Sequence, residues 1–188
     1  MLFETLAVSI VVGLIRKGKF KNIESIPVKG WPFIIAGFLV YISTLIILKY
    51  SSGALSSWIF SNIILLVSTY YLFIIIGILI SSMSVGFVLI STGLGLNGLA
   101  SIVNGGRMPV SADALRIAGL EENISFLSAG KSSVHILADS GTRLYYLADI
   151  IPVPLIIPKV ISIGDIILAI GIFLTIQKYM TLSNSLHS

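Results

Sequence analysis

The stretch WIFSNIILLVSTYYLFIIIGILI, residues 58–80, carries no charged side chain and is long enough to cross a bilayer as one helix. Comparable apolar runs occupy residues 2–15, 31–48, 83–103 and 163–179. The run at 2–15 is short for a span and contains Glu4, so it predicts a short or tilted helix. Together the runs predict an all-α membrane protein, one integral membrane domain over residues 1–188 with about five transmembrane helices.

The composition of the 188-residue chain indicates a lipid environment. Hydrophobic residues make up 56% of the chain and charged residues 11%, whereas soluble domains carry about 25% charged residues. The mean hydropathy is +1.04. The absence of cysteine excludes disulfides, thiolate metal sites and cysteine nucleophiles. Only two histidines are present, one of them His187 in a polar tail, so we expect no metal site and no cofactor.

The positions of the basic residues predict the orientation in the membrane. Five of them lie between the first and second apolar runs: Arg16, Lys17, Lys19, Lys21 and Lys29. The positive-inside rule places this loop in the cytoplasm, which puts the N-terminus outside and the C-terminus inside. Residues 104–161 then form an extracytoplasmic cap between the fourth and fifth spans. Because the basic residues cluster beside a span and not along a groove, nucleic acid is not an expected partner.

The cap contains signals for ordered structure. Residues 104–109, NGGRMP, form a turn-prone run directly after a span, and residues 111–119 predict a short helix with Ser111 as its N-cap and Gly119 as its C-cap. Residues 135–137 and 144–147 are apolar enough to form short strands or to lie in the interface. Three prolines then predict an extended approach to the last span: Pro152, Pro154 and Pro158.

Two aspartates flank this proline segment. Asp149 lies in YYLADIIP, and Asp165 lies in SIGD at the start of the last apolar run. A carboxylate at the edge of hydrocarbon is costly unless it is paired, neutralised or hydrated, which makes both residues functional candidates. Two nearby carboxylates can share a proton, and aspartyl hydrolases prepare one acid and one base in this way. We therefore predict Asp149 and Asp165 as a catalytic pair.

Each aspartate also has a structural interpretation. Ser162 and Asp165 have the spacing of a capping box, in which the carboxylate would stabilise the start of the helix. Asp149 could instead form a turn before the proline segment. The sequence leaves both interpretations open.

Four further residues are candidates for substrate binding or support, each with a structural alternative. Arg107 could bind a phosphate or a carboxylate, or extend toward the lipid headgroups. Arg143 could orient Asp149 through an ion pair, or lie at the surface. Asn104 could hold a substrate carbonyl, or only form a turn. His135 could act as a base, or be a hydrogen-bonded interface residue.

Several motifs are similar to those of an uncharacterised bacterial integral-membrane family, a domain of unknown function. They are NGGRMPVS at 104–111, His135, the T-x-L-x-x-L-x-DIIP pattern at 142–152 and SIGD at 162–165. The resemblance covers most of the chain and implies a bacterial cytoplasmic membrane protein, but it implies no activity.

More distantly, LAD at 147–149 and IGD at 163–165 resemble the catalytic aspartate motifs of lipoprotein signal peptidase (type II signal peptidase). That family has four spans, and its Asn-Gly motif follows the first span, whereas here the Asn-Gly run follows the fourth. The resemblance therefore implies a site geometry more than a substrate.

Three functions follow from these patterns. The first is an aspartyl-type membrane hydrolase or peptidase that acts on a peptide or lipid-linked substrate. The second is a non-catalytic membrane subunit, or a lipid- or ligand-binding protein, whose motifs are structural. The third is a proton-coupled transporter, which the absence of inverted repeats and of charged residues in the third and fourth spans disfavours. Membrane lipid is the one expected partner, and the sequence indicates no oligomeric state.

Overall fold

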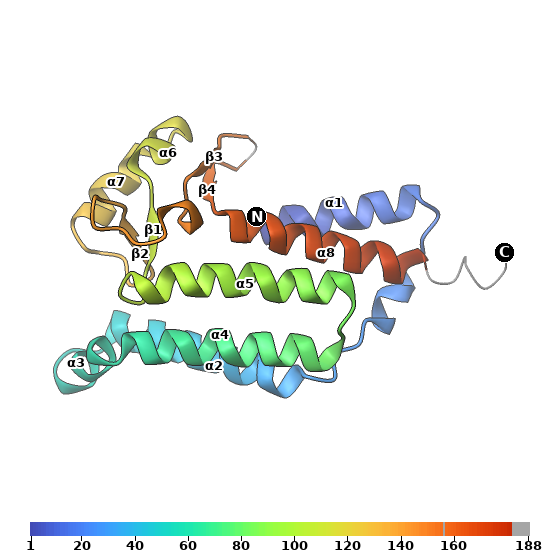
Figure 1. The fold of residues 1–188 in the computed structure, drawn as a ribbon, viewed down its shortest axis with the longest axis horizontal. Helices are drawn as coiled ribbons and strands as arrows, with labels where there is room; N and C mark the ends of the chain where they lie inside the picture. The colour runs from blue at the N-terminus through green and yellow to red at the C-terminus, as the bar shows by residue number, and fades with distance from the viewer. Residues whose placement is uncertain (156, 182–188) are drawn as a thin grey trace.

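The computed structural model describes residues 1–155 and 157–181 (Figure 1), so His187 lies outside the described residues. Its long helices are α1 (Leu2–Ile15), α2 (Trp31–Tyr50), α4 (Ile63–Ser81), α5 (Val85–Val103) and α8 (Ile163–Thr181). They pack side by side in the spatial order α1–α8–α5–α4–α2. A 3-10 helix, η1 (Phe20–Ser25), follows α1, and a short helix, α3 (Ala54–Ser61), precedes α4.

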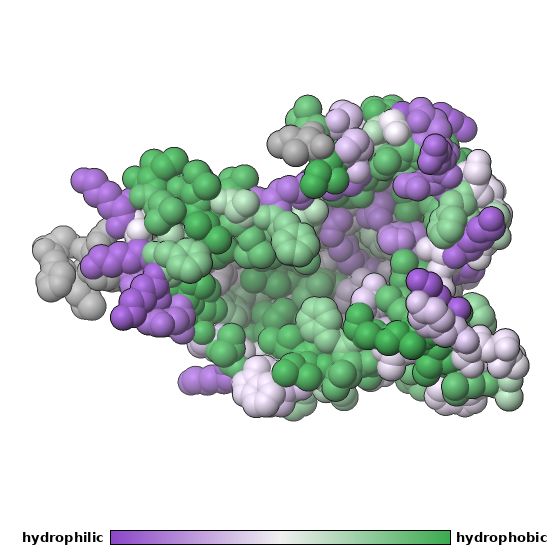
Figure 2. Space-filling view, turned by 180° about the vertical axis from the view of Figure 1, so that it is seen from behind, coloured by the Kyte–Doolittle hydropathy of each residue, from purple (hydrophilic) through white to green (hydrophobic). Residues whose placement is uncertain are grey.

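Four described helices, α2, α4, α5 and α8, are long and apolar enough to cross a membrane. This confirms the predicted fold class, an all-α membrane protein. Helix α1 has 14 residues, which at 1.5 Å per residue gives about 21 Å, less than the thickness of a hydrocarbon core. The expected fifth span is therefore not confirmed. Figure 2 shows apolar side chains over the helices and hydrophilic ones gathered toward the two ends of the molecule.

The predicted third span begins too early in the chain. Residues 58–80 do not form one helix, because α3 ends at Ser61 and α4 begins at Ile63. Asn62 lies between them with φ −112° and ψ 14°, and its side chain donates to the carbonyl oxygen of Trp58 at 2.8 Å. An Asn side chain that binds nearby backbone competes with regular helix. Apolarity continues through the break, so the hydropathy pattern gave no sign of it.

Glycines bring α5 and α8 into close backbone contact. A Cβ atom on Gly93 would lie 2.4 Å from the carbonyl oxygen of Gly164, and one on Gly171 would lie 2.7 Å from that of Gly86. A Cβ on Gly164 would lie 2.0 Å from Oδ1 of Asn97. Small residues allow such close packing between membrane helices. The contact fixes the first turn of α8 against the polar side chain of Asn97.

The cap lies at one end of the helix row, opposite the basic loop after α1 (Figure 1). Its elements are β1 (Met108–Val110), α6 (Ala112–Ile117), α7 (Glu121–Ser128), β2 (His135–Leu137), the 3-10 helix η2 (Tyr145–Leu147), β3 (Ile151–Val153) and β4 (Lys159–Ile161). Strands β1 and β2 pair in parallel, and β3 and β4 pair antiparallel. The extended approach predicted from the prolines is thus a hairpin that leads into α8.

Two predicted features of the cap are confirmed. Gly105 and Gly106 have φ +73° and +79°, which form the expected turn after α5. The hydroxyl of Ser111 accepts a hydrogen bond from the backbone N–H of Ala114 at 3.3 Å, so Ser111 caps α6 as predicted. Residues 145–147, in contrast, form a 3-10 helix and no strand.

Candidate functional site

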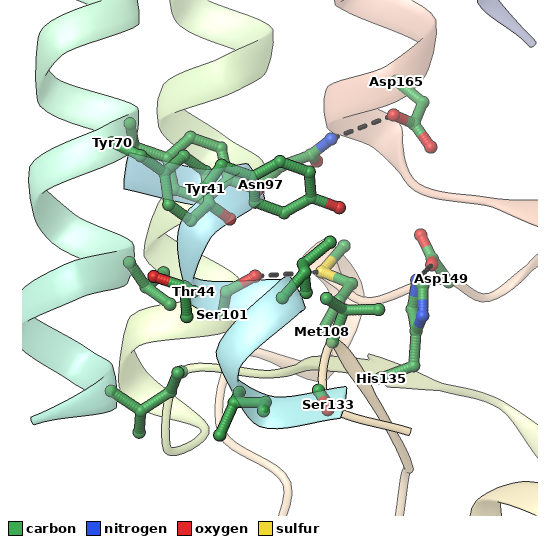
Figure 3. Close-up of a pocket in the computed structure, with 17 residues that line it drawn as sticks. Tyr41, Thr44, Tyr70, Asn97, Ser101, Met108, Ser133, His135, Asp149 and Asp165 are labelled. Carbon is green, nitrogen blue, oxygen red and sulfur yellow. Dashed lines mark hydrogen bonds and ion pairs between the residues drawn. The ribbon is translucent and has the colours of Figure 1, made fainter. Parts of the chain in front are cut away.

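A cavity of about 210 Å³ lies where α2, α4 and α5 meet the cap (Figure 3). Its wall is apolar at Leu45, Leu48, Ile63 and Val67. Polar side chains from five elements and the chain beside them complete the lining: Tyr41, Thr44, Tyr70, Tyr71, Asn97, Ser101, Ser133, His135, Asp149 and Asp165. No Lys or Arg belongs to the lining among the described residues. The two predicted catalytic aspartates and His135 therefore border one cavity.

Asp165 occupies the predicted capping box and also makes a bond outside it. Its backbone N–H donates to Ser162 Oγ at 2.9 Å, and its Oδ2 accepts from the Ser162 N–H at 3.2 Å. Asn97 Nδ2 donates to Asp165 Oδ1 at 2.9 Å, and the Ser162 hydroxyl donates to Asn97 Oδ1 at 2.7 Å. These bonds join α5 to α8 and surround the carboxylate with N–H donors, which complement negative charge.

Asn97 was missed in the sequence. It lies in an apolar run, where a lone amide side chain is a recognisable signal because a polar group in hydrocarbon needs a partner. Its partners, Ser162 and Asp165, are more than sixty positions away along the chain. The spacing of residues within one run could not reveal that contact.

Asp149 is held in place by its backbone. Its N–H donates to the carbonyl oxygen of Pro109 at 2.9 Å, and its own carbonyl accepts from the N–H of Ser111, also at 2.9 Å. Val110 and Asp149 form a parallel bridge, so β1 lies between β2 and the segment that carries Asp149. This three-strand arrangement presents His135 and Asp149 to the same cavity.

The Asp149 carboxyl group lies in an unusual environment. The residue is 8% exposed, and no hydrogen bond to its carboxyl group occurs in the described part of the chain. His135 Nε2 lies 3.9 Å from Asp149 Oδ2, beyond hydrogen-bonding distance. Burial and, to a smaller extent, the charge of Asp165 together raise the pKa of Asp149 to about 8. Burial also lowers the pKa of His135, so near neutral pH both groups are largely uncharged.

Asn104 and Arg143 contact each other away from the cavity. Asn104 Nδ2 donates to the carbonyl oxygens of Ala100 and Arg143, each at 2.8 Å, and Asn104 Oδ1 accepts from the Arg143 N–H at 2.9 Å. The next residue, Leu144, has φ +50°. Asn104 thus anchors the loop that leads to Asp149 onto the end of α5.

The two predicted arginines lie apart from the aspartates. The described residues contain no ion pair between Arg143 and Asp149, and the Arg143 side chain is exposed. Arg107 is half-buried and does not line the cavity. Substrate-binding roles for Asn104, Arg107 and Arg143 stay predictions.

Asn104→Asp is expected to destabilise the cap. The carboxylate keeps the acceptor for the Arg143 N–H but loses both donors, which leaves two carbonyl groups without their partner. A lost hydrogen bond of this kind costs about 1–3 kcal/mol. The apparent melting temperature in detergent measures the effect, with Asn123→Asp at an exposed position of α7 as control. Equal melting temperatures for the two variants would show that the hydrogen bonds donated by the Asn104 side chain do not stabilise the cap.

The pKa of Asp149 predicts that stability falls as pH rises. Between its ordinary value of 3.8 and its folded value of about 8, the folded protein holds a proton that the unfolded chain has released. Folding is therefore weakened through this window, by at most about 1.4 kcal/mol per pH unit. Asp149→Asn removes this slope. His135 has the opposite effect on the pH dependence of stability, because its contribution to the free energy of folding is lost as pH falls below its ordinary pKa of 6.5.

The difference in melting temperature between the wild-type protein and Asp149→Asn isolates the aspartate, since both contain His135. We expect the melting temperature of Asp149→Asn to rise steadily relative to that of the wild-type protein as pH increases from about 5 to 8. A constant difference across this range would mean that Asp149 has an ordinary pKa.

The fold and the cavity define a helical membrane protein with an acidic site beneath a small cap. Residues 25–177 match the family of unknown function DUF5317, and the chain belongs to this family. This confirms the predicted membership of a family without an assigned function. The chain is similar to an uncharacterised protein of Thermotoga maritima, with 37% identity over 91 residues, 47% of this chain and 49% of the relative. The chain thus spans about half the length of that relative, and no solved structure matches it.

Proposed function

We propose that this protein is an aspartyl-type membrane hydrolase in which Asp149 and Asp165 activate water against a peptide or ester bond. One observation supports it above others: both carboxyl groups border one cavity, in contrasting surroundings. Asp165 accepts hydrogen bonds from N–H donors, whereas Asp149 is buried without any. Paired acids whose environments differ in this way supply one base and one acid.

The proposed reaction conserves its protons. Asp165 takes a proton from water as the water oxygen bonds to the carbonyl carbon, and Asp149 donates its proton to the carbonyl oxygen. When the tetrahedral intermediate collapses, the bond to the leaving group breaks. Asp165 then gives its proton to the leaving amine or alcohol, and the hydroxyl proton returns to Asp149. Both carboxyl groups end in their starting states.

The test is unbiased with respect to substrate. Purified protein is mixed with peptides and lipids extracted from bacterial membranes, in water enriched in ¹⁸O. A hydrolase places one ¹⁸O atom in each new carboxylate, which mass spectrometry detects. We expect labelled products that are absent without the protein; if none form over the range of membrane extracts, the protein is not a hydrolase.

We further propose that the chain spans the membrane several times, with the cap and the N-terminus outside and the C-terminus inside. The basic loop and the cap lie at opposite ends of the helix row, which supports this orientation (Figure 1). Because the chain has no cysteine, single cysteines can report it directly. In intact cells, a membrane-impermeant maleimide is expected to label Ser140→Cys in the cap, and Lys21→Cys only after permeabilisation. The reverse pattern would overturn the orientation.

A second function, non-catalytic ligand binding, is favoured by one observation. Asp165 forms a complete capping box with Ser162, so it has a structural role whether or not it reacts. In this case the cavity binds a ligand without cleaving it. Saturable binding without ¹⁸O incorporation would identify this function.

A further inference from the structure

The cavity contains acidic groups without a basic partner. Asp149 and Asp165 border it, and no Lys or Arg does so among the described residues. A second cavity, of about 330 Å³ inside the cap, shares His135 and Asp149 with the first and adds Lys159 to its lining. The Lys159 ammonium group, however, is paired with Glu4 of α1. The acidic side of the site therefore lacks a cationic partner within the described chain.

Asp149 gives an independent sign of a missing partner. The whole residue is 8% exposed and its side chain 12% exposed, it borders both cavities, and its carboxyl group accepts no hydrogen bond in the described structure. A buried carboxyl group without partners is costly. A ligand that donates to it or carries positive charge would relieve this cost.

The wall contributed by α2 and α4 is aromatic. The ring centroids of Tyr41 and Tyr70 lie 5.1 Å apart, and those of Tyr70 and Tyr71 lie 4.5 Å apart. Figure 3 shows Tyr41 and Tyr70 across the cavity from Asp149 and His135. Aromatic faces attract cations, quaternary ammonium groups above all. The same two helices provide the aliphatic wall of the cavity.

We propose that this cavity binds an alkylammonium group, with the Asp149 and Asp165 carboxyl groups facing the ammonium group and the tyrosine cluster as its cation-attracting wall. Leu45, Leu48 and Val67 contact the apolar chain that carries the ammonium group. The assignment rests on the proposed function where it names the substrate class: an amphiphile whose ammonium group lies beside the bond to be cleaved. Either a free amine or a lipid headgroup supplies this chemistry.

The affinity for a cation is expected to rise with pH. The groups that face the site are Asp149, Asp165 of α8, His135 of β2 and the tyrosines of α2 and α4, with Lys159 on the cap side. Asp149, with a pKa of about 8, gains its charge as pH passes through this value. Burial lowers the pKa of His135, so this residue changes charge at lower pH. A quaternary ammonium probe keeps its charge throughout.

The test titrates hexyltrimethylammonium into the full-length protein in phosphatidylglycerol nanodiscs, followed by isothermal titration calorimetry. Hexanol and hexanoate serve as neutral and anionic controls of equal chain length. We expect saturable binding of the cation alone, with affinity that rises between about pH 7 and 9. Equal binding of hexanol or hexanoate would overturn the proposal.

Three variants assign the contacts. Asp165→Asn is expected to lower the affinity for the cation about tenfold or more because it removes one charge at close range. Tyr41→Leu, which leaves both carboxyl groups in place, is also expected to lower the affinity for the cation. Asp113→Asn, at an exposed acid outside the cavity, is the control for net charge and should bind as the wild type does. If all three variants bind equally, the cation does not occupy this cavity.

Two further measurements distinguish a lipid headgroup from a free amine, and the ammonium site from the hydrolase function. Adding phosphatidylethanolamine to the nanodiscs lowers the apparent affinity for the probe if a lipid headgroup occupies the site, and leaves it unchanged if a free amine does. Cation binding without ¹⁸O incorporation would support the proposed binding site and exclude the hydrolase function. Incorporation of ¹⁸O without cation binding would exclude the ammonium site and leave the hydrolase function supported.

Discussion

Asp149→Asn and Asp165→Asn are each expected to abolish ¹⁸O incorporation while the protein stays folded in the membrane. An amide has the shape of the carboxyl group but can neither give up nor take up a proton at neutral pH. General acid or base catalysis contributes about 10²–10⁴-fold to a rate, so each variant should lose at least two orders of magnitude. Mass spectrometry of the labelled products measures the loss.

Asp165→Asn is the sharper of the two variants. Its amide oxygen can still accept the Ser162 N–H, so the capping box, and with it the first turn of α8, should survive. Asp113→Asn, in the exposed first turn of α6, is the matched control and should retain full activity. Wild-type turnover by Asp165→Asn would exclude the catalytic pair. Loss of folding in both site variants would mark the aspartates as structural.

Gly93→Ala is expected to disrupt the contact between α5 and α8. The new methyl group would lie 2.4 Å from the carbonyl oxygen of Gly164, and backbone cannot move aside as a side chain can. Overpacking of this kind costs about 1–3 kcal/mol. Because Gly164 also contacts Asn97, the change should shift Asp165 relative to the cavity and reduce activity and stability together.

Gly95→Ala, two positions along the same helix, is the control. Apart from the adjoining residues and backbone of its own helix, no described atom lies within 4 Å of a Cβ atom at Gly95, and Ala favours a helix over Gly by about 0.8–1.0 kcal/mol. We therefore expect a melting temperature equal to or above that of the wild-type protein. If both variants lose stability alike, glycine serves helix flexibility and not this packing contact.

Features that depend on neighbouring residues were predictable from the sequence. Apolar length predicted the four long helices, and the motif Ser162-x-x-Asp165 predicted the capping box that the structure confirms. Ser111 and the glycine pair after α5 were likewise found through local rules for caps and turns. In each of these cases the interacting groups lie within a few positions of one another.

Features that depend on contacts between helices could not be predicted in this way. Asn97 reaches Asp165 only because glycines draw α5 and α8 together. The tyrosines of α2 and α4 face Asp149 only because the cap folds over the end of the helix row. The break at Asn62 results from a bond between an amide side chain and the backbone within a run of uniform hydropathy. Hydropathy does not record any of these contacts.

If Asp149 and Asp165 form one catalytic site, the buried Asp149 carboxyl group holds a proton near neutral pH beside the Asp165 carboxyl group. The most direct measurement is a carboxyl ¹³C NMR titration of the protein in detergent, with the Asp149 signal assigned by its loss in Asp149→Asn. We predict that Asp149 titrates with a pKa of about 8, and that Asp165→Asn lowers this pKa because it removes the neighbouring charge. Titration of Asp149 near its ordinary value of 3.8, unchanged in Asp165→Asn, would show that Asp149 is not the proton donor of such a site.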